Sequence, residues 1–314
     1  MNESFECYFK ELKKTVDNYK FVIVLGSGFH KNAFRNNSYV NNCLSSWCCL
    51  LKEIKPNLDL SNNYLLDFER IILDNTNSQN EKAAFKIEKE ILKKVVTIID
   101  NYQSEVIKNI NLNYPINIFN SNYISDVISL NFDLIPELLL KKNRKTKVQN
   151  LIKHKNKKSI IHSTRHRVIN GINFWHPHGD VEKYDSLILG TRKYGLHVNR
   201  IEKLRERSKQ KKKPENYQKS WYDVLTHNPV IILGADISDM EWDIWNAIVN
   251  RERNFGKKEN SKQHKFHIFQ MRTICPENKN ETKAKSNEIW FQPLFDENLS
   301  FEEQWNKLNK LFRN

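Results

Sequence analysis

Glycine and proline are scarce in this chain, with 8 of each among 314 residues. This scarcity excludes collagen-like and low-complexity proteins, and an apolar content of 39% predicts a globular fold. No apolar run approaches the roughly 18 residues that a membrane-spanning helix needs. The N-terminus also lacks the apolar core of a secretion signal. We therefore expect no contact with a membrane.

Cysteine is also rare, and the 5 cysteines are irregularly spaced. No two of them form a C-x-x-C pair, which excludes a zinc ribbon of the usual spacing. Cys43, Cys48 and Cys49 crowd one predicted helix. An odd, irregular set without a secretion signal indicates free thiols in a reducing compartment, so the expected location is the cytoplasm.

Short apolar runs along the chain predict buried parallel strands. The clearest are Phe21–Leu25, Val127–Leu130 and Val230–Leu233, each stopped by a glycine or an asparagine. Ser186–Leu189 is a further predicted strand. Stretches of helical periodicity separate these runs. The predicted fold class is α/β, with a Rossmann-like mostly parallel sheet, helices on both faces and a helical insertion lobe.

The expected organisation is a single domain over residues 1–314, since the chain is long enough for one large α/β unit. Helical patterns over about 38–120 predict the insertion lobe. The sheet is expected from 20–37 and 121–275. Such a lobe beside a sheet creates a cleft.

Three polar segments stand where predicted strands end. They are Gly26-Ser27-Gly28, Asn131-Phe132-Asp133 and His176–Asp180. Open parallel sheets bind ligands outside the carboxyl ends of their strands. A glycine loop lets a pyrophosphate approach the backbone, an amide holds a water or a ribose hydroxyl, and a neutral imidazole serves as a base. Together they favour a nucleotide ligand and chemistry at a sugar carbon.

Each segment also has a simpler interpretation. The glycine loop can be a tight strand-to-helix turn, and the third glycine of the dinucleotide fingerprint is replaced by Lys31, which disfavours an ordinary NAD dehydrogenase. Asn131 or Asp133 can cap a helix over Leu134–Leu140.

The segment His176, His178 and Asp180 has the H-x-H-x-D spacing of some metallohydrolases. Such a site needs further ligands, for which His197, His227 and Asp236 are candidates. These three do not form a recognisable second half of a metal site. We therefore expect no metal, and a structural role for His176.

The net charge of +14 is unevenly distributed. Segment 141–167 holds 11 Lys and Arg without an acidic residue, and segment 200–219 holds 9 against three Glu. Both are either solvated surface or an electrostatic footprint for nucleic acid. Stacking aromatics are nearly absent from them, which weakens a single-strand-binding interpretation.

In combination, these segments resemble the sirtuin superfamily, especially the divergent bacterial sirtuin-like domains of anti-phage defence. The resemblance rests on Gly26-Ser27-Gly28, on Ser129–Asp133 and on His178-Gly179. Two later segments, Leu187–Thr191 with Tyr194 and Leu233–Asp239, add to it, so that it extends from about residue 20 to 250.

The resemblance implies an NAD-binding sheet in which the nicotinamide–ribose bond of NAD, as substrate, is cleaved. By that likeness Asn131 would position the ribose or a water, and His178 would be the general base. The implied NAD-binding residues are Gly26, Ser27 and Gly28 at the pyrophosphate, Asp133 at the nicotinamide, and Gly234 and Ser238 near the adenosine.

Two departures from the family pattern shape the expected reaction. The four-cysteine zinc module and an acyl-lysine channel are absent, which favours water as acceptor and hence an NAD glycohydrolase that depletes NAD in abortive infection. Phe29, His30 and Lys31 also replace the usual residues after the glycine loop. The alternatives are an NAD-dependent protein deacylase or ADP-ribosyltransferase, and a non-catalytic nucleotide or nucleic-acid binding module.

The expected partners follow from the need to hold such an enzyme inactive. The chain has no recognisable sensor, so we expect a homo-oligomer or a separate partner such as an ATPase of HerA type. Nucleic acid is a further partner if the basic segments 141–167 and 200–219 contact it.

Overall fold

The computed structural model describes most of the chain. The described ranges are 20–33, 46–61, 63–76, 80–109, 116–119, 121–143, 166–210, 217–235, 241–255, 268–271, 291–295 and 299–312, with Phe5, Cys7, Phe9, Lys10, Leu44 and Ile237 as single residues.

Within these ranges the centre of the molecule is a seven-stranded sheet in the order β3-β4-β2-β1-β5-β6-β7. The strands are β1 (Phe21–Leu25), β2 (Ile124–Ser129), β3 (His166–Ile169), β4 (Ile172–Trp175), β5 (Val230–Leu233), β6 (Ile268–Gln270) and β7 (Gln292–Pro293). Every neighbouring pair is parallel except β3 and β4, which form an antiparallel edge. The predicted α/β fold with a mostly parallel sheet is therefore confirmed.

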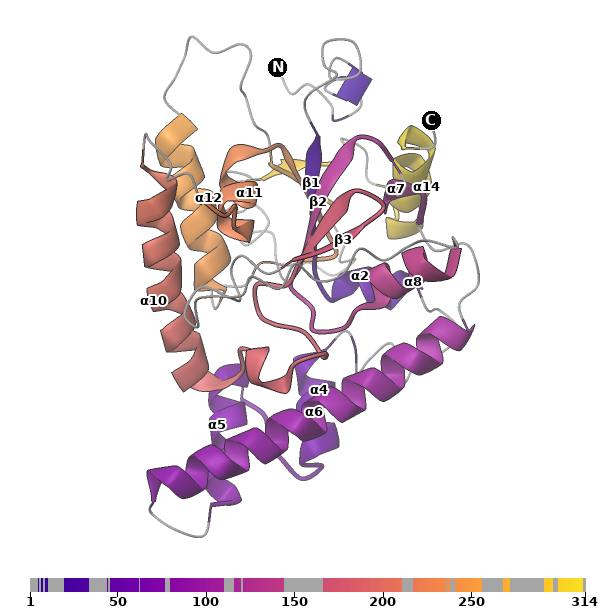
Figure 1. The fold of residues 1–314 in the computed structure, drawn as a ribbon. Helices are drawn as coiled ribbons and strands as arrows, with labels where there is room; N and C mark the ends of the chain where they lie inside the picture. The colour runs from indigo at the N-terminus through magenta and orange to yellow at the C-terminus, as the bar shows by residue number, and fades with distance from the viewer. Residues whose placement is uncertain are drawn as a thin grey trace.

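The helices form two layers and a separate lobe (Figure 1). They are α2 (Gly28–Ala33), α4 (Trp47–Ile54), α5 (Tyr64–Asp74), α6 (Glu81–Asn109), α7 (Ile116–Phe119), α8 (Ile135–Asn143), α10 (Gly190–Ser208), α11 (Trp221–His227), α12 (Trp242–Phe255) and α14 (Phe301–Leu311). Helices α10, α11 and α12 lie on one side of the sheet, and α7, α8 and α14 lie on the other (Figure 1).

The central strands are buried on both faces, as their continuous apolar sequences require. Side chains alternate across a strand, so Phe21, Ile23 and Leu25 of β1 join the core that contains α8 and α14. Val22 and Val24 join the opposite core, with α10, α11 and α12. Both layers therefore hold the carboxyl end of β1 in a fixed position.

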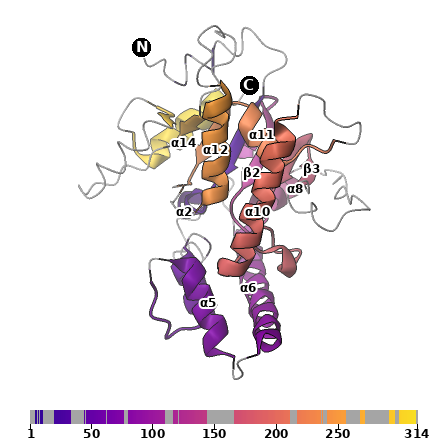
Figure 2. The ribbon, with the colours of Figure 1, turned by 90° about the vertical axis from the view of Figure 1, so that its left-hand side faces the viewer.

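Helices α4, α5 and α6 form the predicted lobe, which lies below the carboxyl ends of the strands in both views (Figures 1 and 2). Its apolar core, built on Phe68 and Val95, also takes in Phe132 and Leu134 after β2 and Leu187 after β4. The lobe thus packs on the loops that follow the strands. These same loops carry the polar segments singled out in the sequence.

The predicted strand Ser186–Leu189 is wrong. Tyr184–Ser186 forms a short 3-10 turn (η1), and the Ser186 hydroxyl donates to the Lys183 carbonyl at 2.6 Å. Leu187 and Leu189 are buried in the lobe core, where burial alone accounts for the apolar run. Buried loops and strands share this apolar signature.

The basic segments are only partly described. Most of 141–167 lies outside the described residues, but Arg167 is buried and its Nη2 lies 2.9 Å from both Asp180 Oδ1 and Glu182 Oε2. In segment 200–219, Arg205 Nη2 lies 2.8 Å from Glu202 Oε2. These two arginines therefore make intramolecular ion pairs. Within the described part of the chain, no helix has both the length and the apolar composition to cross a bilayer.

Candidate active site between sheet and lobe

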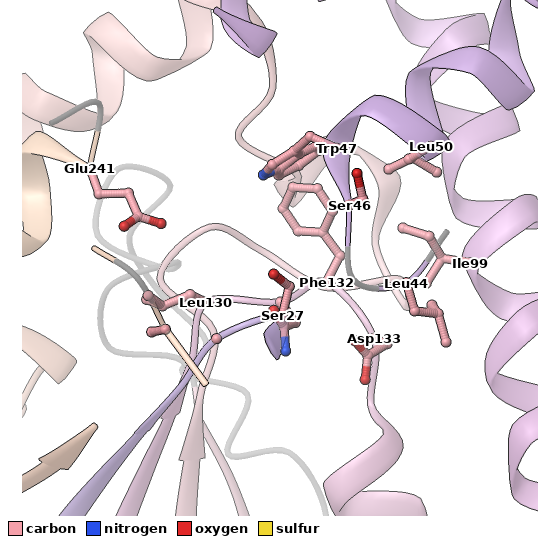
Figure 3. Close-up of a pocket in the computed structure, with 13 residues that line it drawn as sticks. Ser27, Leu44, Ser46, Trp47, Leu50, Ile99, Leu130, Phe132, Asp133 and Glu241 are labelled. Carbon is pink, nitrogen blue, oxygen red and sulfur yellow. The ribbon is translucent and has the colours of Figure 1, made fainter. Parts of the chain in front are cut away.

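A pocket opens between the carboxyl edge of the sheet and the helical lobe (Figure 3). Segments far apart in the sequence meet there, namely the loops after β1, β2 and β5 and helices α4 and α6. The lining residues are Gly26, Ser27, Leu44, Ser46, Trp47, Leu50, Ile99, Leu130, Asn131, Phe132, Asp133, Ala235 and Glu241. The pocket therefore lies where ligands bind in open parallel sheets.

The glycine loop after β1 packs directly on the loop after β5. The Gly28 amide donates to the Gly234 carbonyl at 2.7 Å, and the Gly26 amide donates to the Leu233 carbonyl at 3.0 Å. A Cβ on Gly26 would lie 2.5 Å from the Ala235 Cα, and a Cβ on Gly28 would lie 2.7 Å from the Gly234 oxygen. Both interpretations of the loop fit these contacts, since the turn is tight and Gly26 and Ser27 also face the pocket.

The segment after β2 places Asn131 and Asp133 on the pocket wall, where both meet a histidine of α2. His30 Nε2 lies 2.9 Å from Asp133 Oδ2 and 3.1 Å from Asn131 Nδ2. A carboxylate can only accept, so His30 donates to Asp133. Asp133 Oδ1 also accepts from the Ile135 amide at 3.0 Å, which is the helix-capping contact that the sequence allowed. His30 thus links the glycine loop to the Asn131 segment.

The carboxyl of Asp133 is held ionised by these partners. Burial alone would raise its pKa, but the charge and hydrogen bond of His30 lower the pKa below the ordinary value. A group with a depressed folded pKa adds stability above its unfolded pKa of about 3.8, and loses that stability as the pH falls through the folded value.

Replacing His30 by alanine should leave this buried carboxylate without its side-chain donor. We expect the free energy of unfolding at pH 7 to fall by about 3 kcal/mol. The loss should shrink as the pH falls, first where Asp133 of the variant, whose pKa burial then raises, takes up a proton, and finally below 3.8, where the wild-type carboxyl does so as well. Urea unfolding at several pH values measures it. His227→Ala removes an exposed histidine and should show no such pH dependence; equal losses at pH 3 and 7 for His30→Ala would contradict the assignment.

The three residues of the H-x-H-x-D pattern bind to different partners. His176 is buried between the Asn131 carbonyl (3.1 Å) and Glu137 Oε1 (2.7 Å), consistent with the structural role expected of it. His178 Nε2 lies 3.0 Å from Asp243 Oδ2, and Asp180 pairs with Arg167. The pattern therefore does not gather its own residues around one point.

His178 instead belongs to a buried cluster with His197 and Asp243. Both histidine Nε2 atoms lie 3.0 Å from Asp243 Oδ2, and the Tyr194 hydroxyl donates to Asp243 Oδ1 at 3.2 Å. Among the residues that the structure describes, His178, His197 and Asp243 form a group that could hold a metal ion, because their ligand atoms all lie within 4.8 Å of one another. Each contact is also complete as a hydrogen bond without an ion.

The carboxylate of Asp243 controls the charge of this cluster. Burial would lower the pKa of His178, but the charge and hydrogen bond of Asp243 raise the pKa above its ordinary value. The pKa of His197 is lowered, mainly by burial. Burial opposes ionisation of Asp243, yet the two histidines hold its pKa well below the ordinary value.

An aromatic wall and an acidic group complete the pocket. Trp47 stacks on Tyr64 with ring centroids 4.9 Å apart and meets the Phe132 ring edge-on at 5.1 Å. Glu241 faces them from the opposite side (Figure 3). Trp47 and Tyr64 belong to the lobe, whereas Phe132 and Glu241 follow strands of the sheet, so a ligand in the pocket would contact both parts.

The structure brings most of the predicted site residues together. Gly26, Ser27, Asn131 and Asp133 line one pocket, and His178 hydrogen-bonds to the backbone of Leu130, which also lines it. Behind the pocket, Gly28 and Gly234 hold the two loops against each other.

One predicted residue, Ser238, lies outside the described residues. Sequence reasoning missed Trp47, Glu241 and Asp243, and it noted His30 only as a departure from a family pattern. The polar residues Glu241 and Asp243 follow the β5 loop, which was the one signal available for them.

Comparison with known families agrees with this geometry. A family model described as "SIR2-like domain" matches residues 125–293, more than half of the chain. The matched segment includes Asn131, His178 and Gly234 but begins after the glycine loop. The search of curated proteins found no match. The resemblance inferred from the sequence is therefore confirmed at the level of the superfamily, and the chain belongs to the SIR2-like domain family.

Proposed function

We propose that this protein is an NAD glycohydrolase that cleaves the nicotinamide–ribose bond of NAD in the pocket between sheet and lobe. The observation that carries the proposal is the meeting of the glycine loop with Asn131 in one pocket, with His178 in contact with the Leu130 wall. Family membership supports a sirtuin-like, NAD-related function. The choice of water as acceptor rests on the lack of a C-x-x-C pair for a zinc module.

The proposed reaction consumes NAD and water and yields nicotinamide, ADP-ribose and a proton. The bond from the ribose C1′ to the nicotinamide nitrogen breaks, and its electron pair leaves with nicotinamide. Water attacks the resulting oxocarbenium-like carbon, as in glycosidases. In this scheme Asn131 orients the ribose or the water, and His178 takes the proton.

The remaining pocket residues suit the ends of this substrate. The aromatic wall of Trp47 and Phe132 offers faces and edges to a flat nicotinamide ring. Gly26 and Ser27 line the pocket where a pyrophosphate would approach, since a glycine loop admits close approach.

The direct test is to incubate the purified protein with NAD and to quantify nicotinamide and ADP-ribose. The assay is run at several protein concentrations and with the product of a neighbouring gene, because we propose control by self-assembly or by a partner such as a HerA-type ATPase. We expect equal amounts of both products in at least one state. A lack of NAD turnover in every state would refute the proposal, as would turnover that requires an acylated or acceptor peptide.

The same assay tests the role of His178 through its pH dependence. A base must be neutral to accept a proton, and the pKa of His178 lies above its ordinary value of 6.5. The rate should therefore rise with pH through a pKa above 6.5. The rise would be absent if His178 took no part in the reaction.

The biological setting that we propose is depletion of NAD during phage infection. Total cellular NAD after induced expression, with and without the neighbouring gene product, tests it. An unchanged NAD pool during infection of cells that carry the protein would count against this setting.

A further inference from the structure

Asp243 lies in the first turn of α12, almost fully buried at 1% exposure. It joins three elements that are distant in sequence, because His178 follows β4 whereas Tyr194 and His197 lie on α10. Its carboxylate accepts from all three of these side chains. A buried carboxylate with three donors has one orientation, so its oxygens are fixed points in the site.

The shared oxygen dictates the protonation of both histidines. A carboxylate donates no proton, so each imidazole must carry a proton on the Nε2 atom that faces Oδ2. For His178 this leaves Nδ1 as the nitrogen that gains or loses a proton, and in the charged ring its N–H is the donor for the contact with the Leu130 backbone, at the wall of the pocket. The neutral ring therefore has its unprotonated nitrogen, Nδ1, beside the Leu130 backbone that lines the pocket.

The backbone around His178 is held without Asp243. The His178 carbonyl accepts from the Ile188 amide at 2.8 Å, and the Gly179 amide donates to the His176 carbonyl at 3.1 Å. His197 stacks near Trp221 and is fixed by that packing. Loss of the Asp243 charge should therefore change the His178 ring while leaving its loop in place.

We propose that Asp243 is the positioning residue for His178, fixing its tautomer and ring orientation, with His197 and Tyr194 holding Asp243 in turn. This inference rests on the proposed function, in which His178 is the base. The same logic operates wherever a carboxylate orients a catalytic imidazole through its far nitrogen.

Other charged and titratable groups also face the cluster. They are Glu241 beside His178, Arg200 beside His197, and Tyr64 of α5, which contributes to the surroundings of Tyr194. Asp243 makes the direct contact with His178, so its substitution should have the largest effect on that ring.

The variant is Asp243→Asn, which keeps the shape and removes the charge. The matched control is Asp223→Asn, because Asp223 is also a buried aspartate in the first turn of a helix with serine and tyrosine donors, and it does not contact the cluster. NMR of the full chain labelled with ¹⁵N-histidine follows the ring titrations. The His178 signals among the 10 histidines are identified by comparison with His178→Gln.

In Asp243→Asn, we expect the proton affinity of His178 to fall at least about tenfold, with a matching shift of the pH–rate profile to lower pH. The kcat at pH 7 should fall about 100-fold and KM should change little, since NAD contacts are unaltered. Asp223→Asn should leave the His178 titration unchanged. A stable Asp243→Asn protein whose His178 titrates as in the wild type would overturn the inference.

The last measurement is the metal content of the purified wild-type protein and of Asp243→Asn. A stoichiometric transition metal that is lost in Asp243→Asn would also overturn the inference, because the cluster would then bind an ion. The proposed function and the pairing of Asp243 with His178 can be refuted separately. A wild-type protein without NAD cleavage, whose His178 still shifts in the variant, refutes the proposed function but supports the pairing.

Discussion

Asn131→Ala should lower kcat/KM for NAD cleavage by about 100-fold or more. The Asn131 amide lies on the pocket wall, beside His30 Nε2, and is the group proposed to orient the ribose or the attacking water. Apart from the contact of its side chain with His30, Asn131 is held by its backbone, since its carbonyl contacts His176 and its backbone N–H contacts Ser129 Oγ. Alanine keeps the backbone contacts and removes the side-chain amide with its contact to His30. The rate of nicotinamide release measures the loss.

The control for this variant is Asn173→Ala on β4. Asn173 also uses its side-chain amide in a hydrogen bond, to Asp126 Oδ1 at 2.9 Å, but within the sheet and away from the pocket lining. We expect Asn173→Ala to affect stability more than activity, and Asn131→Ala to do the reverse. Cleavage within threefold of the wild type in a folded Asn131→Ala protein would exclude the amide from the reaction.

Gly234→Ala should lower the free energy of unfolding by about 4 kcal/mol or more, enough to unfold a marginally stable domain. Gly234 has a φ of +63°, and a Cβ there would lie 2.1 Å from the Phe29 backbone nitrogen. Backbone cannot move aside as a flexible side chain can. The glycine loop and α2 would have to shift, and the Gly28–Gly234 hydrogen bond would be disturbed.

Gly171→Ala separates the effect of contact from the effect of backbone strain. Gly171 has a similarly unfavourable φ of +80°, but no atom lies within 4 Å of the position of a Cβ. Its substitution should cost only the strain, about 1–2 kcal/mol. Urea unfolding of both variants gives the comparison. Equal losses would show that the close packing of the β1 and β5 loops contributes little.

Much of the fold could be predicted from the sequence, because strand and helix patterns depend on residues that are close together in the chain. Phe21–Leu25 and Val230–Leu233 could be recognised as strands, since central parallel strands must be apolar on both faces. The loop positions of Asn131 and His178 followed from the strands before them. Pairing of β2 with β4 then brings the two segments to adjacent points of one edge.

The same rules failed where burial came from a different source. Ser186–Leu189 had the apolar run of a strand, but its leucines are covered by the lobe. Sequence pattern reports that a segment is buried and does not report what buries it. The lobe itself was recognised, because helical periodicity is a local property.

The sequence alone therefore determined which chemistry is present at the sheet edge: a glycine loop, an amide and an imidazole, each at the end of a strand. Only the tertiary structure decided the partners of these groups. His30 and Asp133 are 103 positions apart, and His178 and Asp243 are 65 apart. The tautomer and charge of a buried histidine depend on which acceptor faces it, and that acceptor is brought into place only when the helices pack on the sheet.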